Sequence, residues 1–245
     1  MTSPWIREPV VDDAPTLLYC VPHAGGGAAF FRPWRAALAP EVGLCPVVLP
    51  GRESRVRERP MTTVDQIVPP LAQAIRDHAD RPYAILGHSM GAVVAYEVAR
   101  RLSLTGREPS RLFVSGRRAP HLPARRAPRH DLPRDEFLPA VAALGGTPPE
   151  ILRQPDLMGV FLPGLRADFT VNETYQPMPG PPLTCPVSAL TGSTDPEVEV
   201  TEMRAWAQVT TGPYRLRVFP GGHFYLAGPP PEVADALRAD LPVRS

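Results

Sequence analysis

Three residue types that together can perform nucleophilic chemistry occur beside glycine-rich turns of this 245-residue sequence. The first is Ser89, in the stretch Gly87-His-Ser-Met-Gly91, which has the pattern G-x-S-x-G between an apolar run and a helical run. In that context the serine occupies a tight strand-to-helix turn, where small neighbours are needed. We predict that Ser89 is a nucleophile, at a helix N-terminus that favours the negative charge formed in acyl transfer. The alternative is a chance match to a short pattern.

His223 is the candidate base. It follows the alternating stretch Tyr214–Phe219 and a Pro-Gly-Gly turn. In hydrolases with such a turn the chain order is serine, acid, histidine, with the histidine after the last strand. His121 and His130, the other histidines beyond the serine, lie in an arginine-rich stretch instead. The alternative for His223 is an ordinary solvent-loop histidine.

Asp195 is the candidate acid that orients this base. It follows the apolar stretch Pro186–Thr191 and a Gly-Ser-Thr turn, so it leaves a strand shortly before His223. Asp195 followed by proline is also typical of a helix N-cap, and the two roles are compatible. Glu197 and Glu199 are nearby rivals for the same role.

A second glycine cluster, Val21-Pro-His-Ala-Gly-Gly-Gly27, follows the first apolar stretch. We expect the backbone amides of Met90 and Ala24 to form an oxyanion hole, in which each donor can contribute about 3 kcal/mol. A dinucleotide-binding loop is the competing interpretation. It is rejected because no G-x-G-x-x-G is present and no acidic residue ends the second strand near Leu49.

The elements that would position these residues alternate along the chain. Short apolar stretches are separated by helical periodicity, which predicts an α/β fold with a mostly parallel central sheet flanked by helices. The predicted strands are Thr16–Val21, Leu44–Leu49, Tyr83–Leu86, Arg111–Ser115, Pro186–Thr191 and Tyr214–Phe219. The predicted helices are Phe31–Leu38, Pro70–His78, Gly91–Leu104, Glu197–Ala207 and Pro231–Leu241. Pro69 and Pro70 are expected to mark a first helical turn.

The alternation stops between residues 119 and 176. Helical stretches follow one another there, including Asp135–Leu144 and Asp156–Asn172. We interpret residues 119–176 as a helical insertion over the sheet, within one domain that spans residues 1–245. The proline-rich segment Pro177–Pro182 is a stiff connector back to the sheet.

Composition excludes several classes of function. The formal net charge of +1 and the lack of a basic helix make nucleic acid an improbable partner. All 26 basic residues are arginine, so neither a Walker A loop nor Schiff-base chemistry can operate. Three widely spaced cysteines fit neither a disulfide framework nor a metal site. No signal-peptide core or membrane-length apolar run is present. We expect a soluble cytoplasmic protein without metal or cofactor.

Taken together, these motifs resemble those of the discrete type II thioesterases of polyketide and nonribosomal peptide synthesis. The matching stretches are Pro22–Gly26, Leu49–Glu53, Gly87–Gly91, Val114–Pro120, Leu165–Asp168, Gly192 with Asp195, and Gly221–His223. The resemblance implies the α/β-hydrolase fold and a mobile lid, which maps onto residues 119–176. It also implies hydrolysis of acyl groups from the phosphopantetheine thiol of acyl or peptidyl carrier proteins, often to edit wrongly loaded units.

Two other functions remain open from the sequence. One is a carboxylesterase or lipase of the same fold, and the other is a non-catalytic binding protein on this scaffold, because a fold does not determine a function. Two arginine clusters, at residues 52–59 and 117–129, could dock an acidic carrier protein or bind the phosphate of its arm. Solvated loops are the alternative for both clusters.

Overall fold

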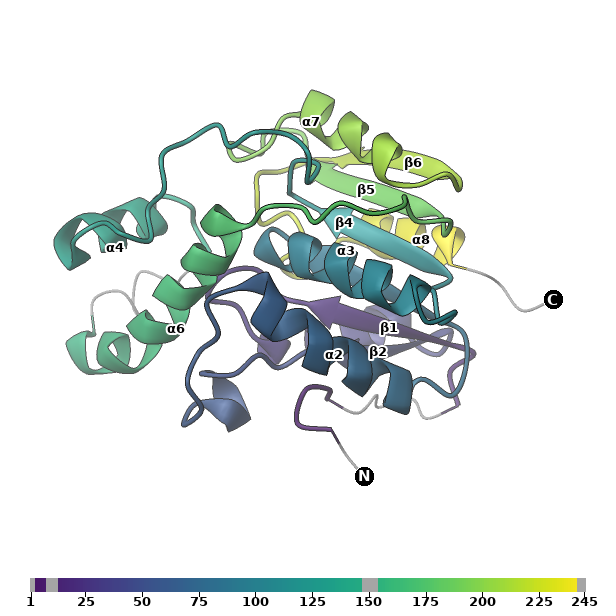
Figure 1. Cartoon of the computed structure of the whole chain (residues 1–245), viewed down its shortest axis with the longest axis horizontal. Coiled ribbons are helices and arrows are strands. Elements are labelled where there is room, and N and C mark those ends of the chain that lie inside the picture. Colours follow the sequence, from purple (N-terminus) through teal and green to yellow (C-terminus); the bar gives the residue numbers. More distant parts are fainter. Residues whose placement is uncertain (1–2, 8–12, 147–153, 242–245) are drawn as a thin grey trace.

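The computed structural model describes residues 3–7, 13–146 and 154–241, which build a six-stranded sheet flanked by helices (Figure 1). The strands are β1 Thr16–Val21, β2 Val42–Pro46, β3 Tyr83–His88, β4 Arg111–Ser115, β5 Val187–Gly192 and β6 Tyr214–Phe219. Their order is β2-β1-β3-β4-β5-β6, and every neighbouring pair is parallel.

The longer helices are α1 Trp34–Leu38, α2 Val64–His78, α3 Met90–Ser103, α4 Arg134–Ala142, α6 Pro155–Thr174, α7 Val200–Arg204 and α8 Pro231–Asp240. Short 3₁₀ turns cover Ala28–Phe31, Glu53–Arg55 and Ala205–Val209. Among the residues described, no helix is both long enough and apolar enough to span a bilayer.

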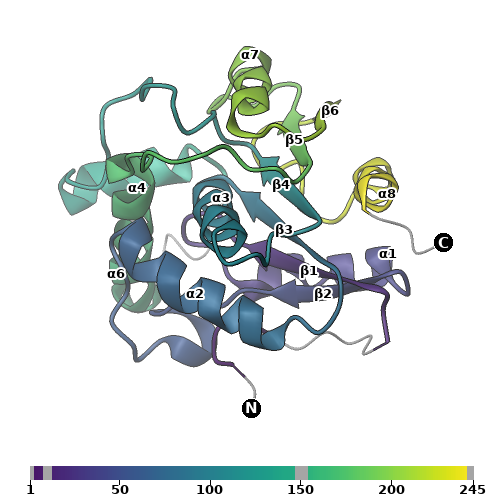
Figure 2. The same cartoon turned by 45° about the vertical axis from the view of Figure 1, so that its right-hand side comes forward.

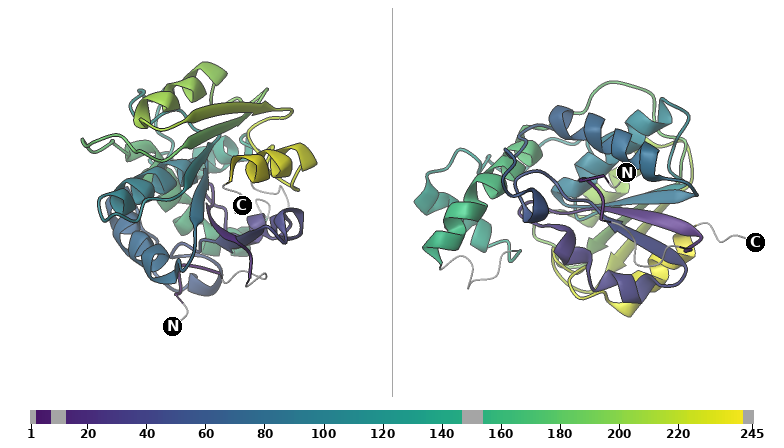
Figure 3. Two further views of the ribbon diagram at one scale, coloured as in Figure 1. Left: turned by 90° about the vertical axis from the view of Figure 1, so that its right-hand side faces the viewer. Right: turned by 90° about the horizontal axis from the view of Figure 1, so that it is seen from below.

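Helices cover both faces of the sheet (Figures 2 and 3). Successive strand side chains point to opposite faces, so in β1 Leu17 and Tyr19 pack with α2 and α3, while Leu18 and Cys20 pack with α1 and α8. β1 is therefore apolar on both sides, as in other buried parallel sheets, whereas the edge strand β6 carries Arg215 and Arg217 and is only partly buried. The cysteines all lie inside these layers, without disulfides. They are Cys20, Cys45 and Cys185.

Most predicted strands are confirmed. β1, β4 and β6 have the predicted bounds, whereas β2 lies two to three residues earlier than expected. The chain leaves β2 at Pro46 because the next residues turn to another partner. Val47 forms an antiparallel bridge with Ile6, and the Val48 amide donates to the Trp5 carbonyl at 2.9 Å.

The expectation for Pro69 and Pro70 is wrong, because both lie inside α2 rather than in its first turn. The helix begins at Val64, where the side chain of Thr63 accepts a backbone hydrogen bond and caps it. An interior proline costs roughly 3 kcal/mol in a helix. Burial of one apolar face offsets that cost. The fully buried residues of this face are Ile67, Leu71 and Ile75.

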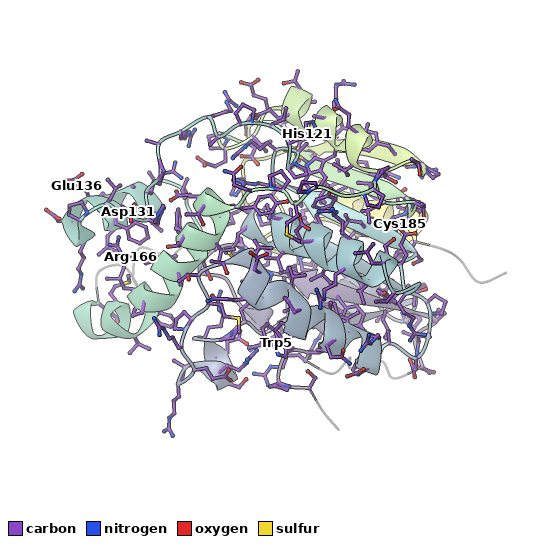
Figure 4. The ribbon with its side chains drawn as sticks, in the orientation of Figure 1. Trp5, His121, Asp131, Glu136, Arg166 and Cys185 are labelled. Carbon is purple, nitrogen blue, oxygen red and sulfur yellow. The ribbon has the colours of Figure 1, made fainter. Side chains whose placement is uncertain are left out.

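The helices of the insertion are confirmed within two residues at each end, as α4 and α6. Figure 1 and the right view of Figure 3 show both helices beyond one end of the sheet. They share a small apolar cluster that includes Phe137 and Phe169. Arg166 on α6 donates to the carbonyls of His130 and Leu132, which fastens the segment before α4 (Figure 4). Residues 147–153 of the insertion lie outside the described residues.

Candidate active site

Ser89 occupies the turn between β3 and α3, with φ 56° and ψ −118°. This strained backbone is rare for a residue with a side chain. The flanking glycines are needed because the turn is crowded: a Cβ on Gly87 would lie 2.0 Å from the carbonyl oxygen of Gly91. A Cβ on Gly91 would lie 2.2 Å from the carbonyl oxygen of Val21. The predicted sharp turn is therefore present.

The predicted site residues follow the carboxyl ends of four parallel strands. Ala24 follows β1, Ser89 follows β3, Asp195 follows β5 and His223 follows β6. The strand order reverses between β1 and β3, because β2 continues on one side of β1 and β3 on the other. Such a switch point is where open α/β sheets form their sites. The structure thus brings these four residues to one edge.

His223 and Asp195 form a buried pair. The Nδ1 atom of His223 lies 2.9 Å and 3.0 Å from the two carboxylate oxygens of Asp195, whose side chain is fully buried. An ionised carboxylate only accepts hydrogen bonds, so Nδ1 carries the proton and Nε2 is left basic. Ser89 and His223 line the same cavity. This arrangement suits transfer of the serine proton to Nε2.

The acid rivals have other partners. Glu197 pairs with Arg126 and Arg129, although it also lines the cavity. Glu199 caps α7 through a capping box and pairs with Arg125 at 2.6 Å. The N-cap role considered for Asp195 is therefore wrong, because Glu199 fills it. Asp195 instead accepts the backbone amide of Glu197 at 2.8 Å, which fixes its carboxylate toward the histidine.

Neither of the other two candidate histidines lines this cavity. His130 Nδ1 lies 2.8 Å from the carboxylate of Glu173, and the same carboxylate accepts the His130 amide. His121 lies in the segment after β4 (Figure 4), and in that segment the Ala119 amide donates to the Glu202 carbonyl of α7 at 3.4 Å. His130 therefore helps to fasten the segment before α4 to α6.

The two predicted oxyanion amides are available as donors. Met90 is the first residue of α3, so its amide has no acceptor within the helix. Ala24 lies in the loop after β1 and lines the cavity with Ser89. Among the described residues, neither amide donates a hydrogen bond to another protein atom. The close approach of Gly91 to the Val21 carbonyl brings the start of α3 against this loop.

A hollow with a mixed lining adjoins the serine. Residues of the insertion and of the loop after β6 line it together with Ser89 and His223. Its apolar side chains are Val141, Leu144, Phe169 and Phe224. Arg129, Asn172 and Glu197 also line it, so apolar and polar groups lie in one hollow beside the serine.

An arginine-rich cavity reaches the same serine from another side. Arg117, which follows β4, lines it together with Ser89 and His223. Arg117 donates to the Asn172 carbonyl at 3.1 Å, and it pairs with no carboxylate among the described residues. Burial, and to a smaller extent the charge of Arg118, lowers the pKa of Arg117 to about 9. An anionic or strongly polar ligand would relieve this isolated cation.

Sequence reasoning missed two buried histidines beside the predicted triad. The rings of His23 and His223 both lie close to His88, with centroid distances of 5.7 and 5.0 Å. Burial is the main cause that lowers the pKa of His88 well below its usual value and that of His23 to about 3. Both rings are therefore neutral at physiological pH. The sequence signal was their position next to the two glycine motifs.

His88 is held by a polar chain that the sequence did not reveal. Its Nδ1 lies 3.0 Å from the hydroxyl of Ser115, which lies 2.6 Å from the hydroxyl of Tyr225. Gly116, with φ 60°, passes between two rings: a Cβ there would lie 2.9 Å from His88 and 3.2 Å from His223. Among the described residues, no group of three or more His, Cys, Asp or Glu side chains is arranged to hold a metal ion.

A parallel sheet with a serine on the strained turn after β3, and a histidine–aspartate pair beyond β5 and β6, defines a protein of the α/β-hydrolase fold. The chain belongs to the thioesterase domain family, whose model matches residues 16–241.

Several relatives are similar to this chain over most of the length of both proteins. Linear gramicidin dehydrogenase LgrE of Brevibacillus parabrevis is 40% identical over 229 residues, which are 91% of this chain and 87% of the relative. Thioesterase PikA5 of Streptomyces venezuelae is 40% identical over 226 residues, with 91% and 80% covered. The solved structure of BorB, a type II thioesterase from the borrelidin biosynthetic cluster, has a TM-score of 0.89 and 38% identity, with 98% of each chain covered.

Proposed function

We propose that this protein is a type II thioesterase that hydrolyses acyl groups from the phosphopantetheine thiol of acyl or peptidyl carrier proteins, as an editing enzyme of polyketide or nonribosomal peptide synthesis. Membership of the thioesterase family and the names of PikA5 and BorB support this function. The observation that carries it is the buried His223–Asp195 pair in a cavity shared with Ser89.

In the proposed mechanism, Ser89 Oγ attacks the thioester carbonyl while His223 Nε2 accepts its proton. The amides of Ala24 and Met90 bind the oxygen of the tetrahedral intermediate. The carbon–sulfur bond then breaks, and the thiolate leaves and takes up the proton from His223. A thiol with a pKa near 8.5 leaves more readily than an amine, so little proton donation is needed. Water activated by His223 then releases the acid from Ser89.

Asp195 keeps the imidazole in the productive orientation and stabilises the imidazolium formed in each step. The neutral rings of His23 and His88 also favour a charged His223. A charged His23 or His88 would repel the imidazolium of His223, and the lowered pKa values of both exclude that charge at neutral pH. Of the three imidazoles in this cluster, His223 is thus the one that accepts a proton and gives it back in each step.

The two cavities divide the substrate between them in this proposal. The acyl chain lies against Val141 and Phe169 in the hollow beside Ser89, while the polar arm occupies the cavity lined by Arg117. Arg125 and Arg126 nearby are about half exposed but paired with glutamates, so an acidic carrier would compete for them. The earlier cluster is less suited to docking, because Arg52 and Arg55 are buried and paired.

We further propose that residues 119–176 act as a lid over the site, within a single domain of residues 1–245. Support comes from the position of α4 and α6 beside the cavity rather than on a sheet face (Figure 1).

Three reduced, buried cysteines are compatible with the reducing cytoplasm, where the substrate carriers would be found.

The name of LgrE contains the word dehydrogenase, but the loop after β1 does not favour that activity here. It lacks the G-x-G-x-x-G pattern that brings a dinucleotide close to a helix N-terminus. His23 and Ala24 of this loop instead line the cavity of Ser89. Thioester hydrolysis therefore remains the function that this site supports best.

The test compares turnover of three substrates by the purified protein: an acylated carrier protein, the matching acyl-coenzyme A and a nitrophenyl ester of the same acyl group. We expect the highest kcat/KM on the carrier protein, and a loss of about 10⁶ in kcat for Ser89→Ala. A decisive preference for the nitrophenyl ester would assign an esterase instead. Inertness on all three would favour a binding protein.

A further inference from the structure

Arg52 and Asp168 form a buried ion pair outside the proposed triad. Arg52 lies in the loop that follows β2, and Asp168 lies on α6 of the insertion. The guanidinium binds the carboxylate with two atoms: Nη1 donates to Oδ2 at 2.8 Å and Nη2 donates to Oδ1 at 2.6 Å. The residues are 8% and 1% exposed. Parallel two-point contacts of this kind fix orientation as well as distance.

The same two side chains also hold the loop that carries the Ala24 amide. The Gly25 amide donates to Asp168 Oδ2 at 2.7 Å, and Arg52 Nη1 donates to the Gly26 carbonyl at 2.8 Å. The Ala24–Gly25 and Gly26–Gly27 peptide groups are therefore anchored to one ion pair. Because the Gly25 amide belongs to the same peptide plane as the Ala24 carbonyl, this contact restricts the rotation of Ala24.

Packing from α6 acts on the same loop. Gly25 has φ 76°, and a Cβ there would lie 2.6 Å from Cδ1 of Leu165, one turn before Asp168. Ala24 itself packs against the apolar cluster that contains Leu165 and Phe169. The Leu165–Phe169 part of α6 thus supplies a carboxylate and an apolar surface to the oxyanion loop.

We propose that Arg52 and Asp168 are positioning residues that hold the Ala24 amide in the oxyanion hole. Hydrolysis then requires that Asp168 on α6 stay bound to Arg52 and to the Gly25 amide. This inference rests on the proposed function, in which Ala24 donates to the intermediate. It divides the insertion into two parts: the region around residues 165–169 stays fixed during turnover, and any opening for substrate takes place elsewhere in the segment.

A merely structural role is the competing explanation, since a buried ion pair is costly to break. The test therefore separates the affinity for the tetrahedral state from stability. Asp168→Asn keeps the size of the side chain but removes its charge. We expect kcat on a nitrophenyl ester to fall about 100-fold with KM changed less than about threefold. The affinity for an alkyl boronic acid, whose serine adduct places an oxygen in the hole, should fall by a similar factor.

Asp240→Asn is the matched control. Asp240 is a buried carboxylate bound by Arg215 and Arg217 beside β6, away from the cavity. This variant should lower the unfolding midpoint while it leaves kcat and boronic acid affinity within about threefold, because it removes the charge of a similarly buried carboxylate without touching the loop.

The double variant Arg52→Met/Asp168→Leu provides a second test if Asp168→Asn fails to fold. Removing both charges restores an apolar interior, so the unfolding midpoint should recover, yet kcat should stay low because Gly25 and Gly26 lose their partners. A stable double variant with kcat within threefold of wild type would overturn the proposal. The ester and boronic acid measurements do not depend on a carrier protein, so a failure of the thioesterase assignment would be seen separately.

Discussion

Replacing Gly91 with alanine tests whether the two proposed oxyanion donors work together. A Cβ at residue 91 would lie 2.2 Å from the carbonyl oxygen of Val21 and 2.6 Å from that of Pro22. An ordinary contact begins near 3.4 Å, so the start of α3 and the loop after β1 must separate by about 1.2 Å, the difference between 3.4 and 2.2. Met90 and Ala24 lie on the two sides of that contact. A misplacement of about 1 Å can cost 10²-fold in rate, and loss of one donor 10²–10³-fold.

We therefore expect Gly91→Ala to lower kcat by about 10² to 10³ on any ester or thioester substrate. The assay is steady-state turnover of a nitrophenyl ester, with the unfolding midpoint measured in parallel. Gly159→Ala on α6 is the control, because a Cβ there meets nothing within 4 Å and should leave kcat unchanged. If Gly91→Ala folded and kept kcat within threefold, the assignment of these amides as a pair would be refuted.

Three further predictions concern charge and protonation. Asp195→Asn should lower kcat by about 10⁴, measured on the same ester, because the amide no longer selects the Nδ1–H form of His223. The free energy of unfolding, measured in urea, should fall as the pH drops from 6.5 towards 3, because His23 binds a proton in the unfolded chain but not in its buried position. The pKa values of His23 in the unfolded and folded chain differ by about 3.5, which corresponds to a loss of up to about 5 kcal/mol near pH 3. His23→Phe should flatten that slope. Arg117→Gln should raise KM for acyl-carrier protein more than for the nitrophenyl ester, and an equal effect on both would argue against a role in binding the polar arm.

Local patterns were sufficient for the strands and for the turn at Ser89. β1, β4 and β6 could be predicted because each is a short apolar or alternating run between clear breaks. The serine turn could be predicted from its local pattern, in which Gly87 and Gly91 crowd each other within one turn. Distant segments also require glycine at these positions. A Cβ on Gly91 would meet the Val21 carbonyl, and one on Gly192 would meet the carbonyls of Gly221 and Gly222.

The remaining features depend on contacts between distant segments. The start of α2 is set by the cap at Thr63 and by the buried face of the helix, which the two prolines do not reveal. The Arg52–Asp168 pair joins residues 116 positions apart, and the histidine cluster joins His23, His88 and His223, so no single-segment pattern reveals these contacts. The arginine clusters were described by composition alone, which cannot separate the buried Arg52 from its exposed neighbours.

The burial of every cysteine makes spectroscopic labelling of this enzyme straightforward. Burial raises the pKa of the Cys20 and Cys185 thiols, and neither these nor Cys45 is exposed, so alkylating reagents should react slowly with the native chain. One new thiol on the exposed side of α6, such as Val160→Cys, would then carry a fluorophore or spin label selectively. Distances from that label would report directly which turns of α6 shift when an acylated partner binds.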